Sequence, residues 1–167
     1  MPRHLLDRIL HGALAGINGA ATMTVLRMLA HRAGLLDQMV PQKVEQWAQR
    51  TAGVSVAPVP SVHRAVDHVL HLGYGATWGA VYGALTPRPR PGGAVAFGVG
   101  VWAIGACILF PTLRIGRPAW RSSAGENTMN IAAHLVYSSV TAFLTEEFSR
   151  QPLRDVASRS PASGRVG

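Results

Sequence analysis

The sequence lacks charge along almost half of its length. Four runs of 18, 20, 23 and 19 residues contain no Asp, Glu, Lys or Arg. Soluble proteins carry about 25% charged residues, so these 80 positions would ordinarily hold roughly 20 charges. A soluble helix of this length keeps one polar face in water, whereas a helix in lipid needs none. The runs are residues 9–26, 68–87, 91–113 and 127–145. Their composition argues against a soluble domain.

The length of these runs matches the thickness of a membrane. At about 1.5 Å per residue, a helix of 18 to 23 residues extends roughly 27–35 Å, close to the hydrocarbon core of a bilayer. We therefore predict an all-α membrane protein in which residues 1–148 form one domain with four transmembrane helices. Their expected bounds are about 9–29, 66–86, 93–113 and 127–146.

The first span is the most polar of the four, because it contains His11 and Asn18. It also fits the core of a signal peptide, but the run continues past the usual length of such a core. We therefore interpret it as a span that Arg27 closes at the membrane surface. Asn18 lies in the middle of this span, and we expect it to hydrogen-bond to a neighbouring helix.

Cysteine is almost absent, and so are the motifs of common enzymes. The single cysteine, Cys107, excludes an internal disulfide, and in the third run it is expected to pack rather than react. The sequence contains no G-x-S-x-G, Walker loop, G-x-G-x-x-G or Cys-x-x-Cys. We therefore predict a protein that is not an enzyme and has no cofactor.

The charge that is present is mostly basic, with 16 Lys or Arg against 8 Asp or Glu. These residues flank the runs, where they would contact anionic lipids, and no aromatic–basic interleaving indicates nucleic acid. The expected partners are the bilayer and either a second copy or another membrane protein. The basic residues divide equally between the two sides, but the short 87–93 turn holds two arginines. This favours a multi-pass membrane protein with both termini in the cytoplasm.

The connections carry two further predictions. In residues 41–50, a proline suited to a first helical turn precedes Val44, Trp47 and Ala48, which would share one helix face. We expect a short interfacial helix there, in the first loop. Residues 149–167 are rich in Arg, Ser, Pro and Gly, and we expect a disordered basic tail.

One pattern occurs twice, 63 residues apart. His71-Leu-Gly-Tyr74 in the second span and His134-Leu-Val-Tyr137 in the fourth are each followed by small residues. Spans two and four cross in the same direction, so the pattern predicts two repeated helical hairpins. Small residues every four positions let helix backbones approach. The expected packing residues are Gly12, Gly16, Gly75, Gly79, Gly83, Ser138 and Ala142.

The repeated histidines allow three interpretations. His71 and His134 can form structural hydrogen bonds between helices, or they can respond to protons, because imidazole titrates in the physiological range. A metal or haem site is the third, with His63 and Asp67 one and two turns before His71 and with His134 as a further ligand. A polar start to the helix is the simpler explanation of His63 and Asp67, so we predict no metal.

Three segments give the chain a resemblance to a known family. They are Pro41-Gln-Lys-Val, His71-Leu-Gly-Tyr-Gly with Gly79-Ala-Val-Tyr-Gly83, and Ala133-His134-Leu-Val-Tyr137. Over residues 5–148 the chain resembles the YagU-like small inner-membrane proteins of bacteria, whose function is unknown. The resemblance implies four membrane helices and supplies no catalytic residues, and some members have been linked to acid resistance.

These observations predict a non-enzymatic inner-membrane protein that supports envelope stress or acid tolerance, with His71 and His134 as its proton-responsive residues. A small transporter or channel subunit is the first alternative. A metal- or haem-binding membrane oxidoreductase is the second.

Overall fold

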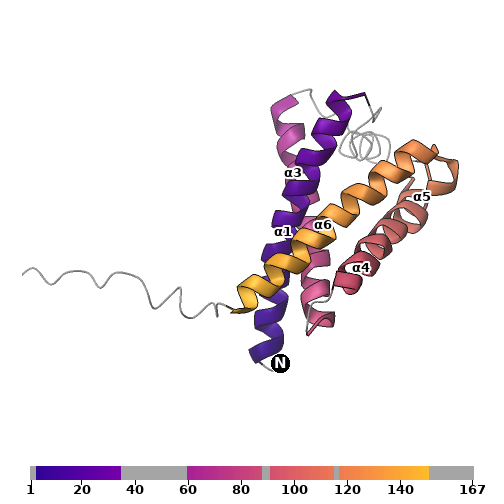
Figure 1. The fold of residues 1–167 in the computed structure, drawn as a ribbon. Helices are drawn as coiled ribbons and strands as arrows, with labels where there is room; N and C mark the ends of the chain where they lie inside the picture. The colour runs from indigo at the N-terminus through magenta and orange to yellow at the C-terminus, as the bar shows by residue number, and fades with distance from the viewer. Residues whose placement is uncertain (1–2, 35–59, 88–90, 115–116, 151–167) are drawn as a thin grey trace, which may run out of the picture.

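The computed structural model describes residues 3–34, 60–87, 91–114 and 117–150, with residues 3, 60–67 and 91 described by their backbone alone. Within these ranges the chain forms four long helices and no strand, which confirms the all-α prediction. The first, second and fourth are continuous, and the third consists of three consecutive helical segments (Figure 1). The elements are α1 (Arg3–Arg32), α3 (Pro60–Leu85), α4 (Pro91–Ala103) with η1 (Ile104–Leu109) and α5 (Phe110–Leu113), the short η2 (Ala119–Arg121), and α6 (Ala124–Arg150).

Each long helix contains one of the charge-free runs. Two of them, His4–Arg32 and Gly92–Leu113, are long and apolar enough to cross a membrane. α6 ends at Arg150, so Ser149 and Arg150 are helical rather than part of the tail, and Arg150 pairs with Glu146 at 2.7 Å. The predicted interfacial helix at 41–50 and the tail from residue 151 lie outside the described residues.

α1 packs against both α3 and α6, and α4 packs against α6. Gly12 and Gly16 of α1 meet α3 in reverse order along the chain, so these two helices are antiparallel. Gly19 meets α6, with Tyr137 and Thr141 as its neighbours. The two helices that carry the repeated pattern, α3 and α6, therefore run in the same direction (Figure 1).

The third helix changes character halfway along. α4 contacts α3 only near the connecting turn, where the ring of Phe97 lies against Trp78 and Tyr82. The π-helical segment η1 follows, and in it the Phe110 N–H donates to the carbonyl of Gly105, five residues back. Pro111 explains this wide turn, because a proline in an α-helix has no N–H and its ring clashes with the carbonyl four residues earlier. The helix ends at Arg114 in the left-handed conformation.

The core of the bundle is built from small residues and from polar side chains that bond within their own helix. The hydroxyls of Thr141 and Thr145 are buried and donate to carbonyls one turn earlier, at 2.8 and 2.7 Å. The expectation for Asn18 is wrong. Its amide is exposed and donates at 2.9 Å to Leu14 of the same helix, because Asn18 faces away from both α3 and α6.

Candidate functional site

The small residues of α1 and α3 form a seam in which backbone meets backbone. A side-chain carbon added to Gly79 would collide with the carbonyl of Gly12 and lie 2.7 Å from the Cα of Gly16. Added to Gly16, it would collide with the carbonyl of Gly75. Gly83 is equally close to the carbonyl of Arg8. The five predicted glycines thus meet in one interface, which we call the glycine seam and which has no room for side chains.

The second hairpin makes an equivalent contact. Ser138 occupies the same position in its repeat as Gly75, is fully buried, and faces Gly98 of α4. A carbon added to Gly98 would collide with the Ser138 hydroxyl. Ala142 packs one turn further along, in a cluster with Ala94 and Tyr82. In each hairpin, a glycine of the first helix therefore meets the same motif position of the second helix.

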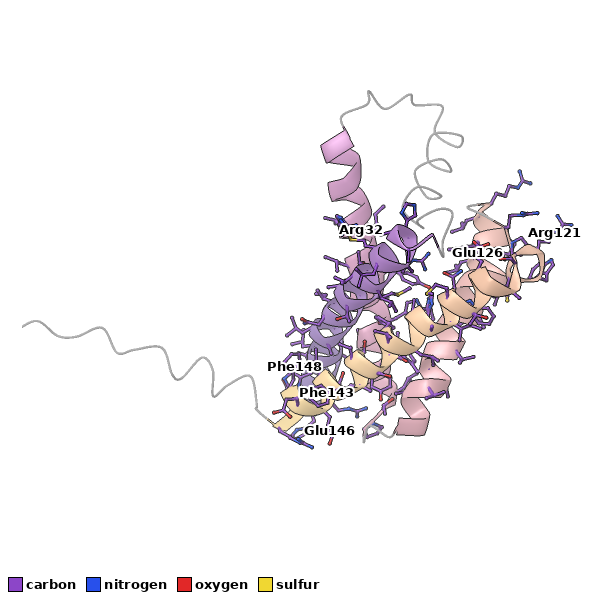
Figure 2. The ribbon with its side chains drawn as sticks, turned by 45° about the horizontal axis from the view of Figure 1, so that its top comes forward. Arg32, Arg121, Glu126, Phe143, Glu146 and Phe148 are labelled. Carbon is purple, nitrogen blue, oxygen red and sulfur yellow. The ribbon has the colours of Figure 1, made fainter. Side chains whose placement is uncertain are left out.

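Beyond the glycine seam, α3 and the third helix diverge and leave a cavity of about 500 Å³. It lies toward the end of the bundle opposite the N-terminus of α1 and the C-terminus of α6, the end at which Figure 2 shows Arg32, Arg121 and Glu126. All four long helices line it. Its polar or ring-bearing lining residues are Arg27, His71, Tyr74, Trp102, Phe110, Asn130, His134 and Tyr137.

Arg27 is the charged residue of the cavity. It is 4% exposed, and its Nη1 donates to Oδ1 of Asn130 on α6 at 2.7 Å. Its Nε has no hydrogen-bond partner, and the charge of Glu126, one turn before Asn130, acts on it. Arg27, interpreted from the sequence as the residue that closes the span, is therefore buried between helices. Gly16 lies 4 residues after Gly12, and Arg27 lies 11 residues after Gly16. These spacings place all three on one helix face, so the sequence alone could have predicted that Arg27 faces a neighbouring helix.

The two repeated histidines lie in the same cavity. His134 donates from Nδ1 to the carbonyl of Asn130 at 2.7 Å, which leaves Nε2 as the nitrogen that accepts a proton. The ring of His71 lies against the backbone of Ala20 on α1, and its Nε2 is buried without a partner. The rings are close enough that a charge on His71 acts on His134, and the charge of Arg27 acts on both.

The aromatic residues join the cavity to the glycine seam. The hydroxyl of Tyr137 donates to the carbonyl of Gly75 at 2.7 Å, across the space between α6 and α3. Trp102 contributes an indole Nε1 that is buried without a partner. Together with Arg27 Nε and His71 Nε2, three residues that line the cavity, on three helices, each carry a buried nitrogen without a partner.

Only two of the four candidate metal ligands can be placed in the described part of the chain. Of its four candidate ligands, His71 and His134 line the cavity, and the side chains of His63 and Asp67 lie outside the described residues. Among the described residues, no group of three or more His, Cys, Asp and Glu is placed to hold a metal ion.

No protein-family model, curated protein or solved structure matches the chain. Evidence about function therefore comes mainly from the residues that line the cavity. Among the described residues, its lining contains a buried cation, two imidazoles and an unpaired indole N–H, and no Asp or Glu. Such a site can accept protons.

Proposed function

We propose that the chain is a non-enzymatic, multi-pass protein of the inner membrane with four spanning helices and cytoplasmic termini. Charge-free runs in all four helices support this, as do the two helices that meet the length and hydropathy required of a span. So does the outer face of α1, where Leu10, Leu14, Val25, Met28 and Leu29 are all exposed. A large exposed apolar surface is costly in water and suits lipid.

We further propose that the protein responds to acid through His71 and His134. The observation that carries this proposal is that both histidines share one cavity with the buried Arg27. At neutral pH the lining holds one formal charge, and protonation of both rings adds two more of the same sign. Like charges in a medium of low dielectric constant repel strongly. Acid would therefore loosen this end of the bundle.

Most of the charged and titratable groups around the two rings are basic or neutral. α1 contributes Arg27, α3 contributes His68 near His71 and the phenol of Tyr74, and α6 contributes Glu126 and Tyr137. The third helix places no titratable residue in the lining. Glu126 is the one acidic group among them, and it lies in the first turn of α6 (Figure 2). The resemblance to YagU-like proteins linked to acid resistance points the same way.

Fluorine NMR of protein labelled with 5-fluorotryptophan tests the acid response. We expect the Trp102 resonance to shift between about pH 7 and about pH 4, a range that covers imidazole titration. The Trp78 resonance should move less, because that ring packs against Phe97 near the turn. The shift should disappear in the His71→Gln, His134→Gln double variant and persist in the control His31→Gln, an exposed histidine near the end of α1.

A Trp102 resonance that does not titrate, or one that titrates equally in the double variant, would show that the histidines are structural. Because the double variant keeps Glu126, titration of that carboxyl is separated from titration of the imidazoles. Reporter fusions test the topology independently. Fusions after residue 167 and within the 87–93 turn should report the cytoplasm, and fusions near Ser55 and Ser123 the periplasm.

A further inference from the structure

The two hairpins differ at one matched contact. Gly19 of α1 lies against Thr141 of α6. The repeat of 63 residues matches Thr141 with Trp78 of α3. There the third helix presents Phe97, whose ring centroid lies 6.2 Å from that of Trp78 and 4.9 Å from that of Tyr82. Aromatic rings therefore fill the contact of α3 with the third helix, where the contact of α1 with α6 has a glycine and a threonine.

The rings keep the third helix away from α3. A glycine lets two backbones approach closely, and α1 and α6 make an extensive contact. The third helix and α3 touch only near the connecting turn, at Phe97, and beyond that ring the space between them is the cavity of about 500 Å³. The opening therefore comes from a difference between the two repeats rather than from loose packing.

The surface that faces the free space is apolar. Polar groups of the lining bond to the protein itself, as when Arg27 donates to Asn130 and Tyr137 donates to the carbonyl of Gly75. The lining nitrogens that lack a partner are buried in the wall, so the free space is bounded mostly by carbon. An apolar cavity of about 150 Å³ can stay dry and bind benzene, and this one is roughly three times larger. Its chemistry suits a hydrocarbon.

The cavity opens sideways and has the length of one lipid chain. Leu70 of α3 and Leu113 of α5 line it and are 55% and 41% exposed, so in the proposed membrane they face lipid. The third helix lines the cavity from Val101 to Leu113, which at about 1.5 Å per residue is about 18 Å. One leaflet of a hydrocarbon core of about 30 Å is about 15 Å deep. A single acyl chain fits lengthwise along this wall.

The end of the cavity at Leu113 has basic surroundings. Arg114 follows directly, and Arg117 and Arg121 lie in the connection to α6, all three exposed. Figure 2 shows Arg121 at this end of the bundle. Among the described residues of that connection none is acidic, and the first carboxyl group is that of Glu126 in α6. Clusters of basic residues beside a membrane span attract anionic lipid head groups.

We propose that the cavity holds one acyl chain of an anionic phospholipid from the surrounding bilayer. The head group lies beside Arg114 and Arg121, and the chain runs along η1 toward Val101. The proposal rests on the membrane location proposed above and does not depend on the acid response. It gives Phe97 and Trp78 a role, which is to hold open the space that the chain occupies.

Photolabelling of the wild-type protein tests the placement of the chain. The full-length protein is reconstituted in phosphatidylcholine nanodiscs that contain phosphatidylglycerol with a diazirine on one acyl chain. A diazirine at the end of the chain should label residues near Val101, and one close to the ester should label residues near Leu113, as mapped by mass spectrometry. Both signals should saturate as the fraction of labelled lipid rises. Labelling that does not saturate, or that falls mainly on the exposed face of α1, would overturn the proposal.

Two substitutions test the shape of the cavity. Gly105→Leu should abolish the saturable labelling, because a carbon added there meets only the Tyr74 hydroxyl, at 3.8 Å, and a larger side chain fills the free space. Gly100→Leu is the matched control in the same helix, since nothing lies within 4 Å of its missing side chain. Phe97→Ala should also reduce labelling, because the third helix can then approach α3. Unchanged labelling in Gly105→Leu would overturn the site, and increased labelling in Phe97→Ala would overturn the role of the rings.

Competition identifies the head group. Unlabelled phosphatidylglycerol should compete better than phosphatidylcholine, and this preference should weaken in Arg114→Gln, Arg121→Gln and persist in Arg150→Gln at the opposite end of the bundle. Equal competition by the two lipids would overturn the anionic assignment, and stronger competition by palmitate would overturn the assignment to a phospholipid.

The failure of this proposal can be told apart from the failure of the membrane location. Absence of saturable labelling in a protein whose reporter fusions confirm four spans would refute the lipid site alone. Recovery of the whole chain in the soluble fraction without detergent would refute the membrane location, and the lipid site with it.

Discussion

The two halves of α3 differ in how closely they approach the neighbouring helices. From Gly75 to Gly83 the helix has no side chains toward α1, and the two backbones touch. One turn before Gly75, on the same ridge, His71 replaces glycine, and there the bundle opens into the cavity. α6 repeats the arrangement, with Ser138 packed against Gly98 and His134 one turn earlier. Residues spaced by four along one helix face can therefore pack one end of a bundle tightly and leave a cavity at the other end.

The largest expected effect comes from breaking the locked half. Gly79→Leu should prevent assembly of the bundle, because a side chain there meets the backbones of Gly12 and Gly16. Overpacking typically costs about 1–3 kcal/mol, and contact with backbone on both sides leaves little room to relax. The measurement is the yield and thermal stability of purified protein. Gly73→Leu is the matched control on the exposed face of α3, where nothing lies within 4 Å. Equal stability of both variants would contradict the seam.

A smaller effect is expected where the open half is held together. Asn130→Leu removes the acceptor of Arg27 Nη1 and leaves that cation without its side-chain partner. Hydrogen bonds to charged groups contribute about 1.5–3 kcal/mol, so the free energy of unfolding in denaturing detergent should fall by about this amount. Asn18→Leu is the control, since its amide is exposed and bonds only within its own helix. A variant as stable as wild type would show that Arg27 does not depend on Asn130.

A still smaller loss of stability is expected from a substitution at the boundary between the two halves. Tyr137→Phe removes the hydroxyl that donates to the Gly75 carbonyl and leaves a buried acceptor unpaired. We expect a loss of about 1–2 kcal/mol in the same unfolding assay. Thr77→Val removes an exposed hydroxyl that bonds within α3 and should change stability little. Equal effects of the two substitutions would show that the Tyr137 hydroxyl does not stabilise the contact between α6 and the glycine seam.

The smallest effect has the opposite sign. Gly73→Ala should stabilise α3 by about 0.5–1 kcal/mol, because Gly73 lies in an open helical position and alanine has the higher helix propensity. Gly75→Ala, two residues later, should destabilise the protein, since the added methyl group would lie 2.5 Å from the Cβ of Ala20. The comparison of melting temperatures separates helix propensity from close packing. A stabilising Gly75→Ala would place the seam elsewhere on the helix.

The sequence predicts the locked half better than the open half. The spacing of Gly12, Gly16 and the three glycines of α3 predicts faces that pack closely, and the structure brings these faces together. It also predicts a shared surface for His71 and His134, which line one cavity. Periodicity fixes which face of a helix is small, and two matching small faces have few ways to pack.

The remaining features depend on which helix lies opposite. Arg27 at the end of a charge-free run resembles an interface anchor. Its spacing from Gly12 and Gly16 places it on the packing face of α1, but only the position of Asn130 on α6 shows its hydrogen-bond partner. Asn18 has the composition of an interhelical contact, but no helix faces it in the described structure. The cavity itself arises because α3 and the third helix diverge beyond Phe97, and no local sequence signal specifies that divergence.

Distances between spin labels measure the contrast between the two halves most directly. In a Cys107→Ala background, one pair of labels at Leu70 and Leu113 spans the opening of the cavity, and a second pair at Leu85 and Phe143 reports the locked end through exposed positions. Acidification from about pH 7 to about pH 4 should lengthen the first distance, leave the second unchanged, and have no effect in the His71→Gln, His134→Gln variant. A first distance that is constant with pH, or two distances that lengthen together, would contradict an acid-responsive cavity held at one end by a glycine seam.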